Sequence, residues 1–294
     1  MEIREIGIVG CGLMGSGIAQ IAAVAGFPTT VAEATQELCE RGMSGIAKRL
    51  DRLVEKGSLA AGERDVVSKR LRATTELSRL SHCDLVIEAI TENPEEKLNL
   101  WRALDPLLRP EAIRASNTSS VSITQMMMAT SRPERFLGMH FFNPVPVMTL
   151  VELVKTLVTD PEVYESAAAF TRKLGKTAVH TTDRPGFIVN RLLIPYLTDA
   201  IRALEEGVGS ITDIDKAMKL GCNHPMGPLT LADFTGLDIC HNVAEIMFRE
   251  FRETRYAPPP LLKRLILLGH LGRKTGRGFY DYSVNPPKPA NLGL

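Results

Sequence analysis

Short apolar runs alternate with longer amphipathic stretches through the first 183 residues of the chain. Apolar runs of about four to eight residues predict buried strands, whereas apolar positions three or four apart predict helices. The expected strands are residues 6–9, 29–32, 85–89, 113–116, 136–140, 149–154 and 177–181. Helices are expected at residues 17–25, 94–108, 121–128 and 163–174. Strands joined by helical crossovers predict a doubly wound, mostly parallel sheet.

Two helical patterns follow one another between the second and third expected strands. Residues 37–56 carry Leu38, Ile46, Leu50 and Leu53 at helical intervals, and residues 61–71 form a shorter partner. Because no strand pattern separates them, a helical pair inserted in the sheet is expected.

The pattern changes at residues 183–186, Asp-Arg-Pro-Gly. Beyond this point helical spacing dominates, at residues 187–206, 212–220, 228–251 and 261–268. Pro195 should kink or locally break the first of these helices. We therefore expect an α/β domain over residues 1–183 and an all-α C-terminal domain over residues 184–294.

A glycine-rich turn joins the first strand to the first helix. Gly10 permits the tight turn, Gly12 lets the backbone approach a pyrophosphate, and Gly15 lets the helix pack closely on the strand. The backbone from Gly10 through Leu13 and Met14 would present free N–H groups to phosphate at a helix N-terminus. A strand before this turn and a helix after it indicate a Rossmann-type dinucleotide-binding domain.

Glu33 follows the second strand, where an acid that binds the adenosine ribose is expected. Its carboxylate would accept bonds from both ribose hydroxyls and would repel a 2′-phosphate. Residues 34–38 contain no Arg or Lys to neutralise such a phosphate. The preferred cofactor is therefore predicted to be NAD rather than NADP.

His140 lies at the end of an expected strand, and Glu152 follows twelve residues later. A lone strand histidine is more often structural, but a histidine with a carboxylate that orients its ring is a general acid–base pair. Downstream of a dinucleotide fingerprint, this pair predicts a dehydrogenase.

Composition narrows the possible partners, metal content and cellular location of the protein. The formal net charge of +1 gives no general attraction to nucleic acid or to an anionic membrane, and no apolar run is long enough to span a bilayer. The five cysteines are scattered without C-x-x-C spacing, and the histidines show no metal-ligand spacing. A cytoplasmic enzyme without a metal, with no nucleic-acid or membrane partner, is expected.

Motifs across nearly the whole chain resemble the L-3-hydroxyacyl-CoA dehydrogenase family. They are residues 10–20, 116–120, 140–148, 185–191 and 275–280. Residues 224–228 and 272–276, together with the lack of an appended hydratase domain, make the chain most similar to the single-function bacterial members that act on 3-hydroxybutyryl-CoA. The resemblance implies an acyl-CoA substrate, a preference for a short acyl chain, and a homodimer formed by the helical domain. The preference for a short chain rests on the resemblance alone.

The resemblance also implies roles for single residues. Ser119 would bond near the substrate oxygen and the nicotinamide, and Asn190 would position the 3-oxygen. Ser119 could instead cap the helix near residue 121, and Asn190 could be a structural link. Further cofactor contacts are implied at Glu92, Lys97, Asn143 and Lys274, of which the first two could also be surface charges.

Basic residues of the first inserted helix could bind the phosphates of coenzyme A. The resemblance places a contact at Lys56, and Arg49 lies where a related sequence has serine. A solvated helix face explains these charges equally well. Two other functions remain open: a dehydrogenase of a non-CoA hydroxy acid such as carnitine or a sugar acid, and a cofactor-binding structural protein without turnover.

Overall fold

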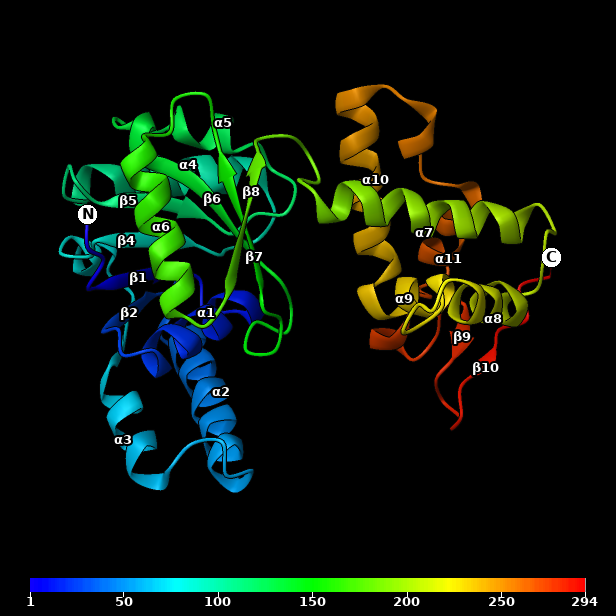
Figure 1. The fold of residues 1–294 in the computed structure, drawn as a ribbon, viewed down its shortest axis with the longest axis horizontal. Helices are drawn as coiled ribbons and strands as arrows, with labels where there is room; N and C mark the ends of the chain where they lie inside the picture. The colour runs from blue at the N-terminus through cyan, green and yellow to red at the C-terminus, as the bar shows by residue number, and fades with distance from the viewer. Residues whose placement is uncertain (294) are drawn as a thin grey trace. The chain divides into compact units, whose positions relative to one another are not determined.

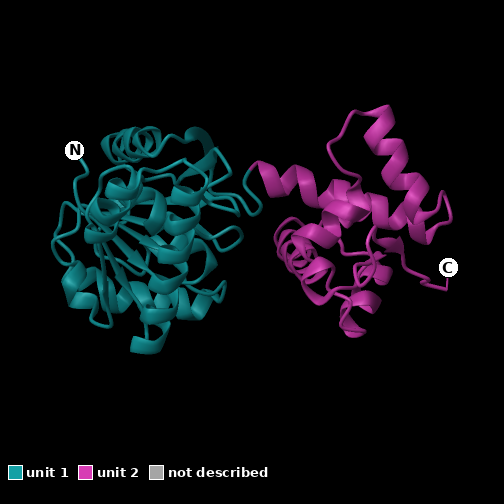
Figure 2. Ribbon diagram, turned by 90° about the horizontal axis from the view of Figure 1, so that it is seen from below, with its two compact units in different colours: residues 1–187 teal, residues 188–294 magenta. Residues whose placement is uncertain are grey.

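The computed structural model describes residues 1–293, which form two compact units (Figure 2). The first unit is Met1–Phe187, and the second begins at Ile188. The sequence places the boundary slightly earlier, after Asp183, in the same connecting segment.

The first unit is built on a sheet that, within residues 1–293, has eight strands in the order β3-β2-β1-β4-β5-β6-β7-β8 (Figure 1). These strands are β1 (Ile6–Val9), β2 (Thr29–Ala32), β3 (Leu71–Thr74), β4 (Leu85–Glu88), β5 (Ile113–Ser116), β6 (Phe136–Phe141), β7 (Leu150–Lys155) and β8 (Thr177–Thr182). Strands β1 to β6 are mutually parallel, β7 is antiparallel to β6, and β8 is parallel to β7. The predicted doubly wound, mostly parallel sheet is confirmed.

Helices connect these strands and cover the sheet. They are α1 (Leu13–Val24), α2 (Gln36–Glu55), α3 (Ala61–Lys69), α4 (Pro94–Leu104), α5 (Ile123–Met127) and α6 (Pro161–Lys173), with short 3-10 turns η1 (Leu77–Leu80), η2 (Asp105–Leu107) and η3 (Pro133–Arg135). All residues of β1, β2, β4 and β5 are buried, as expected for strands with both faces covered. Figure 1 shows α2 and α3 side by side, extending away from the sheet as the predicted helical pair.

One strand of the sheet was not predicted. Residues 71–74, which the sequence assigns in part to the helix over residues 61–71, form β3 at the sheet edge beside β2. The helix itself ends at Lys69. Only Leu71 of this strand is buried, so its apolar pattern is too weak to predict it.

The second unit is helical, with α7 (Val189–Glu205), α8 (Ile211–Gly221), α9 (Pro228–Thr235), α10 (Leu237–Phe251) and α11 (Pro260–Leu267). Its shorter elements are η4 (Thr254–Tyr256), η5 (Arg273–Thr275) and the strand pair β9 (Tyr280–Asp281) and β10 (Lys288–Pro289). Apolar faces of α7, α9, α10 and α11 enclose a single core that includes Leu197, Leu237 and Leu262.

Two details of this unit differ from the sequence prediction. The helix expected over residues 228–251 is divided into α9 and α10 at Gly236, whose φ of 102° is outside the helical region. Conversely, α7 continues through Pro195 without the local break that was one of the expected outcomes. The Thr198 hydroxyl donates to the Pro195 carbonyl within this helix.

Candidate active site

The turn between β1 and α1 has the geometry of a dinucleotide-binding loop. Gly10 has a φ of 96°, and a Cβ there would lie 2.6 Å from the Ala89 carbonyl oxygen. A Cβ at Gly15 would overlap the Gly10 carbonyl oxygen, so the helix and the turn can pack only with glycine at this position. At Gly12, by contrast, a Cβ would meet no described atom within 4 Å. The space beside Gly12, at the N-terminus of α1, therefore fits a pyrophosphate.

A cavity of about 760 Å³ opens from this turn along the carboxyl ends of β1, β2 and β4. Gly10, Gly12, Leu13, Met14 and Glu33 are among its lining residues. Its volume lies in the usual range for a bound small molecule or cofactor, and its place at the carboxyl edge of a parallel sheet is where such folds bind dinucleotides.

Glu33 holds the phosphate turn as well as lining the cavity. One carboxylate oxygen accepts the Cys11 N–H at 2.7 Å, and the other accepts the Ala34 N–H at 2.9 Å. The structure thus brings the predicted ribose-binding carboxylate directly beside the glycine turn.

Arg41 is a charged neighbour of this site that sequence reasoning missed. It lines a smaller hollow together with Gly12, Glu33 and Arg49. Residues 34–38 carry no Arg or Lys, whereas one further helical turn of α2 brings Arg41 to the same face as Leu38. A cation therefore does lie near the predicted ribose-binding acid.

His140 and Glu152 form a buried pair on neighbouring strands. They are directly opposed in the register of β6 and β7, and His140 Nδ1 lies 2.7 Å from Glu152 Oε2. Glu152 is fully buried, and the rings of Phe142 and Phe187 lie beside the imidazole at 4.4 and 5.6 Å between centroids. Since Nδ1 faces the carboxylate, Nε2 is the ring nitrogen left to exchange a proton with a substrate.

Ser119 lies after β5, at the same carboxyl edge of the parallel strands. Glu92 accepts its backbone N–H at 2.6 Å and its hydroxyl at 3.0 Å. The alternative of a helix cap at Ser119 is wrong, because α5 begins two residues after Val121 and its N-cap is Ser122, whose side chain accepts the Gln125 N–H.

Lys97 is not the surface charge that the sequence left open as an alternative. Its side chain is only 1% exposed, and its ammonium lies 2.6 Å from Glu88 and 3.2 Å from Glu92. Desolvation raises the pKa of Glu92, but the Lys97 charge and hydrogen bonds from Ser119 and Thr118 outweigh it, so that this pKa is lowered overall. Glu92 is therefore held as a carboxylate beside Ser119.

Asn143 is exposed at the start of the loop after β6. This loop is fixed by Lys176, whose ammonium donates to the carbonyls of Val145 and Met148 at 2.6 Å each. Asn190 and Lys274 belong to the second unit: Asn190 lies in the first turn of α7, and Lys274 in η5 forms an ion pair with Asp238 at 2.6 Å.

The two basic residues predicted to bind coenzyme A have different surroundings. Lys56 is exposed at the C-terminal end of α2. Arg49 instead faces α1, where its guanidinium donates to Gln20 Oε1 at 2.6 Å and to Ser16 Oγ at 3.0 Å. Arg49 thus connects α2 to the first helix, whereas Lys56 is accessible to a ligand.

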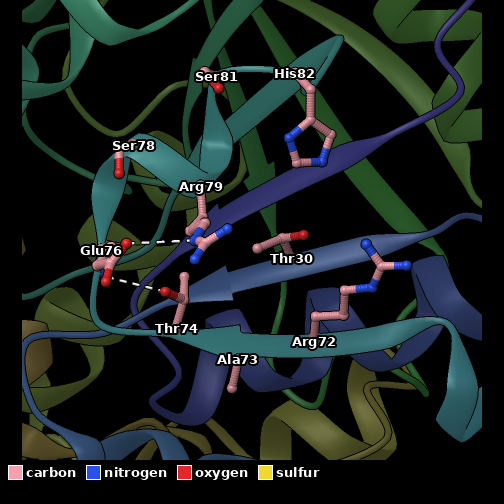
Figure 3. A pocket seen from close by; sticks show the side chains of 9 residues that line it. All are labelled: Thr30, Arg72, Ala73, Thr74, Glu76, Ser78, Arg79, Ser81 and His82. Atoms are coloured by element: carbon pink, nitrogen blue, oxygen red, sulfur yellow. Dashed lines mark hydrogen bonds and ion pairs between the residues drawn. The ribbon is translucent and has the colours of Figure 1, made fainter.

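A separate hollow lies by β2, β3 and η1 (Figure 3). Figure 3 shows Arg79 paired with Glu76, at 3.3 Å between Nε and Oε2. The Glu76 N–H donates to Thr74 Oγ1 at 3.1 Å, and His82 pairs with Glu5 at 2.9 Å. Among the described residues, none lines both this hollow and the dinucleotide cavity.

Two other kinds of feature are absent from residues 1–293. No cluster of three or more His, Cys, Asp or Glu side chains in this range is arranged to hold a metal ion. No helix in the same range is long and apolar enough to cross a membrane.

A dinucleotide-binding turn and a buried histidine–carboxylate pair, placed on one α/β unit, define a nicotinamide-dependent dehydrogenase. The family model "3-hydroxyacyl-CoA dehydrogenase, NAD binding domain" matches residues 5–184, and "3-hydroxyacyl-CoA dehydrogenase, C-terminal domain" matches residues 186–282. The chain therefore belongs to the 3-hydroxyacyl-CoA dehydrogenase family, as its motifs predicted.

Relatives of known name cover nearly the full chain. A 3-hydroxybutyryl-CoA dehydrogenase of Mycobacterium tuberculosis is 49% identical over 95% of this chain and 99% of its own length. A 3-hydroxybutyryl-CoA dehydrogenase of Bradyrhizobium diazoefficiens is 46% identical over 98% of this chain and 98% of its own length. The crystal structure of the (S)-3-hydroxybutyryl-CoA dehydrogenase of Ralstonia eutropha matches with a TM-score of 0.94 and 44% identity, covering 96% of this chain and 100% of that one.

Proposed function

We propose that the protein interconverts (S)-3-hydroxyacyl-CoA and 3-oxoacyl-CoA with NAD, and that its substrate is short, of the 3-hydroxybutyryl-CoA and acetoacetyl-CoA type. The observation that carries the proposal is the buried contact of 2.7 Å between His140 Nδ1 and Glu152. The names of the relatives support the thioester substrate and the short chain.

His140 is the acid–base group in this proposal. With Nδ1–H donated to Glu152, Nε2 carries a lone pair and accepts the proton of the substrate 3-hydroxyl during oxidation. Bound NAD supplies the nicotinamide ring that takes the hydride from C3. The fully buried Glu152 carboxylate fixes the imidazole tautomer and stabilises the imidazolium while His140 holds the proton.

Ser119 and Asn190 assist this step in the proposal. Because Ser119 donates its hydroxyl hydrogen to Glu92, its oxygen is left as an acceptor for the carboxamide donor of the nicotinamide. Asn190 supplies an amide donor for the 3-oxygen from the second unit.

The cofactor contacts are assigned by their place in the fold and by the family motifs. Gly10, Gly12 and Gly15, with the backbone of Leu13 and Met14, hold the pyrophosphate. Glu33 binds the adenosine ribose, and further contacts come from Glu92, Lys97, Ser119, Asn143 and Lys274. Support for this set is strongest at Gly12, where the space beside the helix N-terminus is open.

Coenzyme A is proposed to contact the helical pair through Lys56. The exposed ammonium at the end of α2 supports this assignment. Arg49 is the weaker of the two predicted coenzyme A contacts, because its guanidinium is already bonded to Ser16 and Gln20.

We further propose a cytoplasmic homodimer in which the second unit supplies the interface and part of the substrate cleft. Exposed apolar side chains of that unit, among them Leu192, Leu220 and Leu267 at 70%, 77% and 78%, support an interface. Sedimentation velocity at micromolar concentration tests the assembly, and a monomer would contradict it. Cell fractionation tests the location.

The activity is tested by following NADH consumption with acetoacetyl-CoA, a longer 3-oxoacyl-CoA and free acetoacetate. We expect turnover of the thioesters, fastest for the short one, and a loss of about 10²- to 10⁴-fold in kcat for His140→Gln. His82→Gln, at an exposed histidine outside the candidate site, is the matched control and should retain full activity. Turnover of free acetoacetate alone would favour a hydroxy-acid dehydrogenase, and NADH binding without turnover of any substrate would favour a structural protein.

A further inference from the structure

Glu88, the last residue of β4, is a fully buried carboxylate that the proposed chemistry does not use. One of its oxygens accepts the Lys97 ammonium at 2.6 Å and the Ile90 N–H at 2.8 Å. The other accepts the Ser116 hydroxyl at 2.5 Å. Every contact of Glu88 therefore leads to a segment at the carboxyl edge of the sheet, where the cofactor cavity lies.

Two series of hydrogen bonds and ion pairs connect Glu88 to Ser119 and to Thr118. In the first, Lys97 bridges Glu88 and Glu92, and Glu92 accepts both the N–H and the hydroxyl of Ser119. In the second, Ser116 Oγ accepts the Thr118 N–H at 3.2 Å, and the Thr118 hydroxyl donates to Glu92. Both paths converge on Glu92.

A buried ion pair is a weak device for stability alone, because taking two charges out of water offsets most of their attraction. The pair Glu88–Lys97 has side chains 0% and 1% exposed, so this desolvation is nearly complete. The charges instead fix positions. Because the Lys97 ammonium is held by the buried Glu88 carboxylate, it attracts the Glu92 carboxylate to a defined place. Glu92 is 42% exposed, and the Lys97 ammonium adds a charge to the hydrogen bonds from Thr118 and Ser119 that hold its carboxylate.

We propose that Glu88 is a positioning residue for the reaction. It holds the Lys97 ammonium where that charge fixes Glu92, and Glu92 in turn orients the Ser119 hydroxyl with its hydrogen directed away from the substrate. This inference rests on the proposed role of Ser119. Glu88 and Ser116 touch neither substrate nor cofactor in the proposal. They act by keeping Ser119 Oγ available as a hydrogen-bond acceptor.

The test is a double-mutant cycle between Glu88→Gln and Ser119→Ala. Glutamine keeps the shape of Glu88 and removes its charge. In the wild-type background Glu88→Gln should lower kcat by about tenfold or more, since small misplacements of a group at the reaction centre have effects of this order. In the Ser119→Ala background the same change should lower kcat by a clearly smaller factor, because the hydroxyl through which Glu88 acts is gone and only the proposed cofactor contacts of Lys97 and Glu92 remain to be perturbed.

Asp105→Asn provides the matched control. Asp105 and Arg114 form another buried ion pair of the same unit, with side chains 5% and 1% exposed and a contact of 2.7 Å. Its loss should lower the melting temperature but leave kcat within about twofold, so it reports what breaking a buried pair does to folding alone. A kcat for Asp105→Asn as low as that for Glu88→Gln would overturn the assignment.

The same cycle is measured on the dissociation constant of NADH, which does not depend on the thioester. If the wild type fails to reduce acetoacetyl-CoA, the proposed function fails, while coupling between Glu88 and Ser119 in NADH binding would still support the positioning role. Additive effects in both measurements would overturn it. If Glu88→Gln does not fold, Ser116→Ala takes its place in the cycle with the same expectations, because it removes the hydroxyl that links Glu88 to Thr118.

Discussion

His140 and Glu152 are directly opposed residues on β6 and β7, so that their side chains lie on the same face of the sheet. In the described part of the chain, every other pair of neighbouring strands in this sheet is parallel. Because the chain reverses direction after β6, β7 places the Glu152 carboxylate directly opposite His140.

Replacing Glu152 by Gln should lower kcat by about 10²- to 10⁴-fold, because an amide no longer stabilises the imidazolium and can turn its NH₂ toward Nδ1. The binding of NADH should be unchanged. Steady-state kinetics and a fluorescence titration with NADH measure the two effects. A kcat within about threefold of the wild type would remove Glu152 from this role.

Two glycines of the phosphate turn should respond in opposite ways to alanine. Gly12→Ala should leave the melting temperature of the apo protein unchanged and weaken NADH binding by about tenfold or more, because its Cβ enters space open to the pyrophosphate. Gly15→Ala should lower the melting temperature, because its Cβ overlaps the Gly10 carbonyl oxygen. Thermal unfolding and NADH titration of both variants check this, and identical behaviour would contradict the separate roles.

Replacing Glu33 by Ser should allow the enzyme to use NADPH. In Glu33→Ser the 2′-phosphate no longer meets a carboxylate, and Arg41 in the adjoining hollow supplies a positive charge. The ratio of kcat/KM for NADPH to that for NADH should rise by about tenfold or more, equivalent to about 1.4 kcal/mol. Adding Arg41→Ala should remove much of the gain. An unchanged ratio in Glu33→Ser would show that Glu33 does not set the cofactor preference.

Asp233 should make the stability of the second unit depend on pH. Burial raises its pKa to about 6, against hydrogen bonds from the N–H groups of Phe279 and Tyr280 and from the Tyr282 hydroxyl. The protonated form is thus favoured by folding, and its stabilising contribution is complete below about pH 4 and lost as the pH rises through about 6. The difference from the usual value of 3.8 corresponds to about 3 kcal/mol.

Urea unfolding of wild type and Asp233→Asn between pH 4 and pH 8 isolates this contribution, because asparagine does not titrate. The free energy of unfolding of the wild type should fall relative to that of the variant between about pH 4 and pH 6, and the difference should be constant above about pH 7. A difference that is constant over the whole range would contradict the raised pKa.

Much of the fold could be predicted because the relevant signals are local. Strands such as residues 6–9 are continuous apolar runs, and the glycine turn has a fixed spacing. The register that opposes His140 to Glu152 is set by the pairing of β6 with β7 and is not visible in residue spacing alone. The break at Gly236 was missed because the apolar pattern continues across it, while the positive φ depends on tertiary packing.

Long-range contacts of charged residues were the least predictable part of the site. Lys97 has the sequence environment of a surface helix, yet it is buried between Glu88 and Glu92. Arg49 was placed with the basic face of α2, but its bonds to α1 depend on how the two helices cross. Such contacts follow from packing that is complete only once the sheet and its helices have assembled.

Arg49 joins the inserted helical pair to the helix that begins at the phosphate turn. Ser16 lies one residue after Gly15, so the guanidinium reaches almost to the dinucleotide loop itself. A tilt of α2 cannot occur without either breaking this bond or carrying the start of α1 with it. The helical pair, where coenzyme A is proposed to bind, is therefore anchored to the helix whose N-terminus is proposed to hold the pyrophosphate.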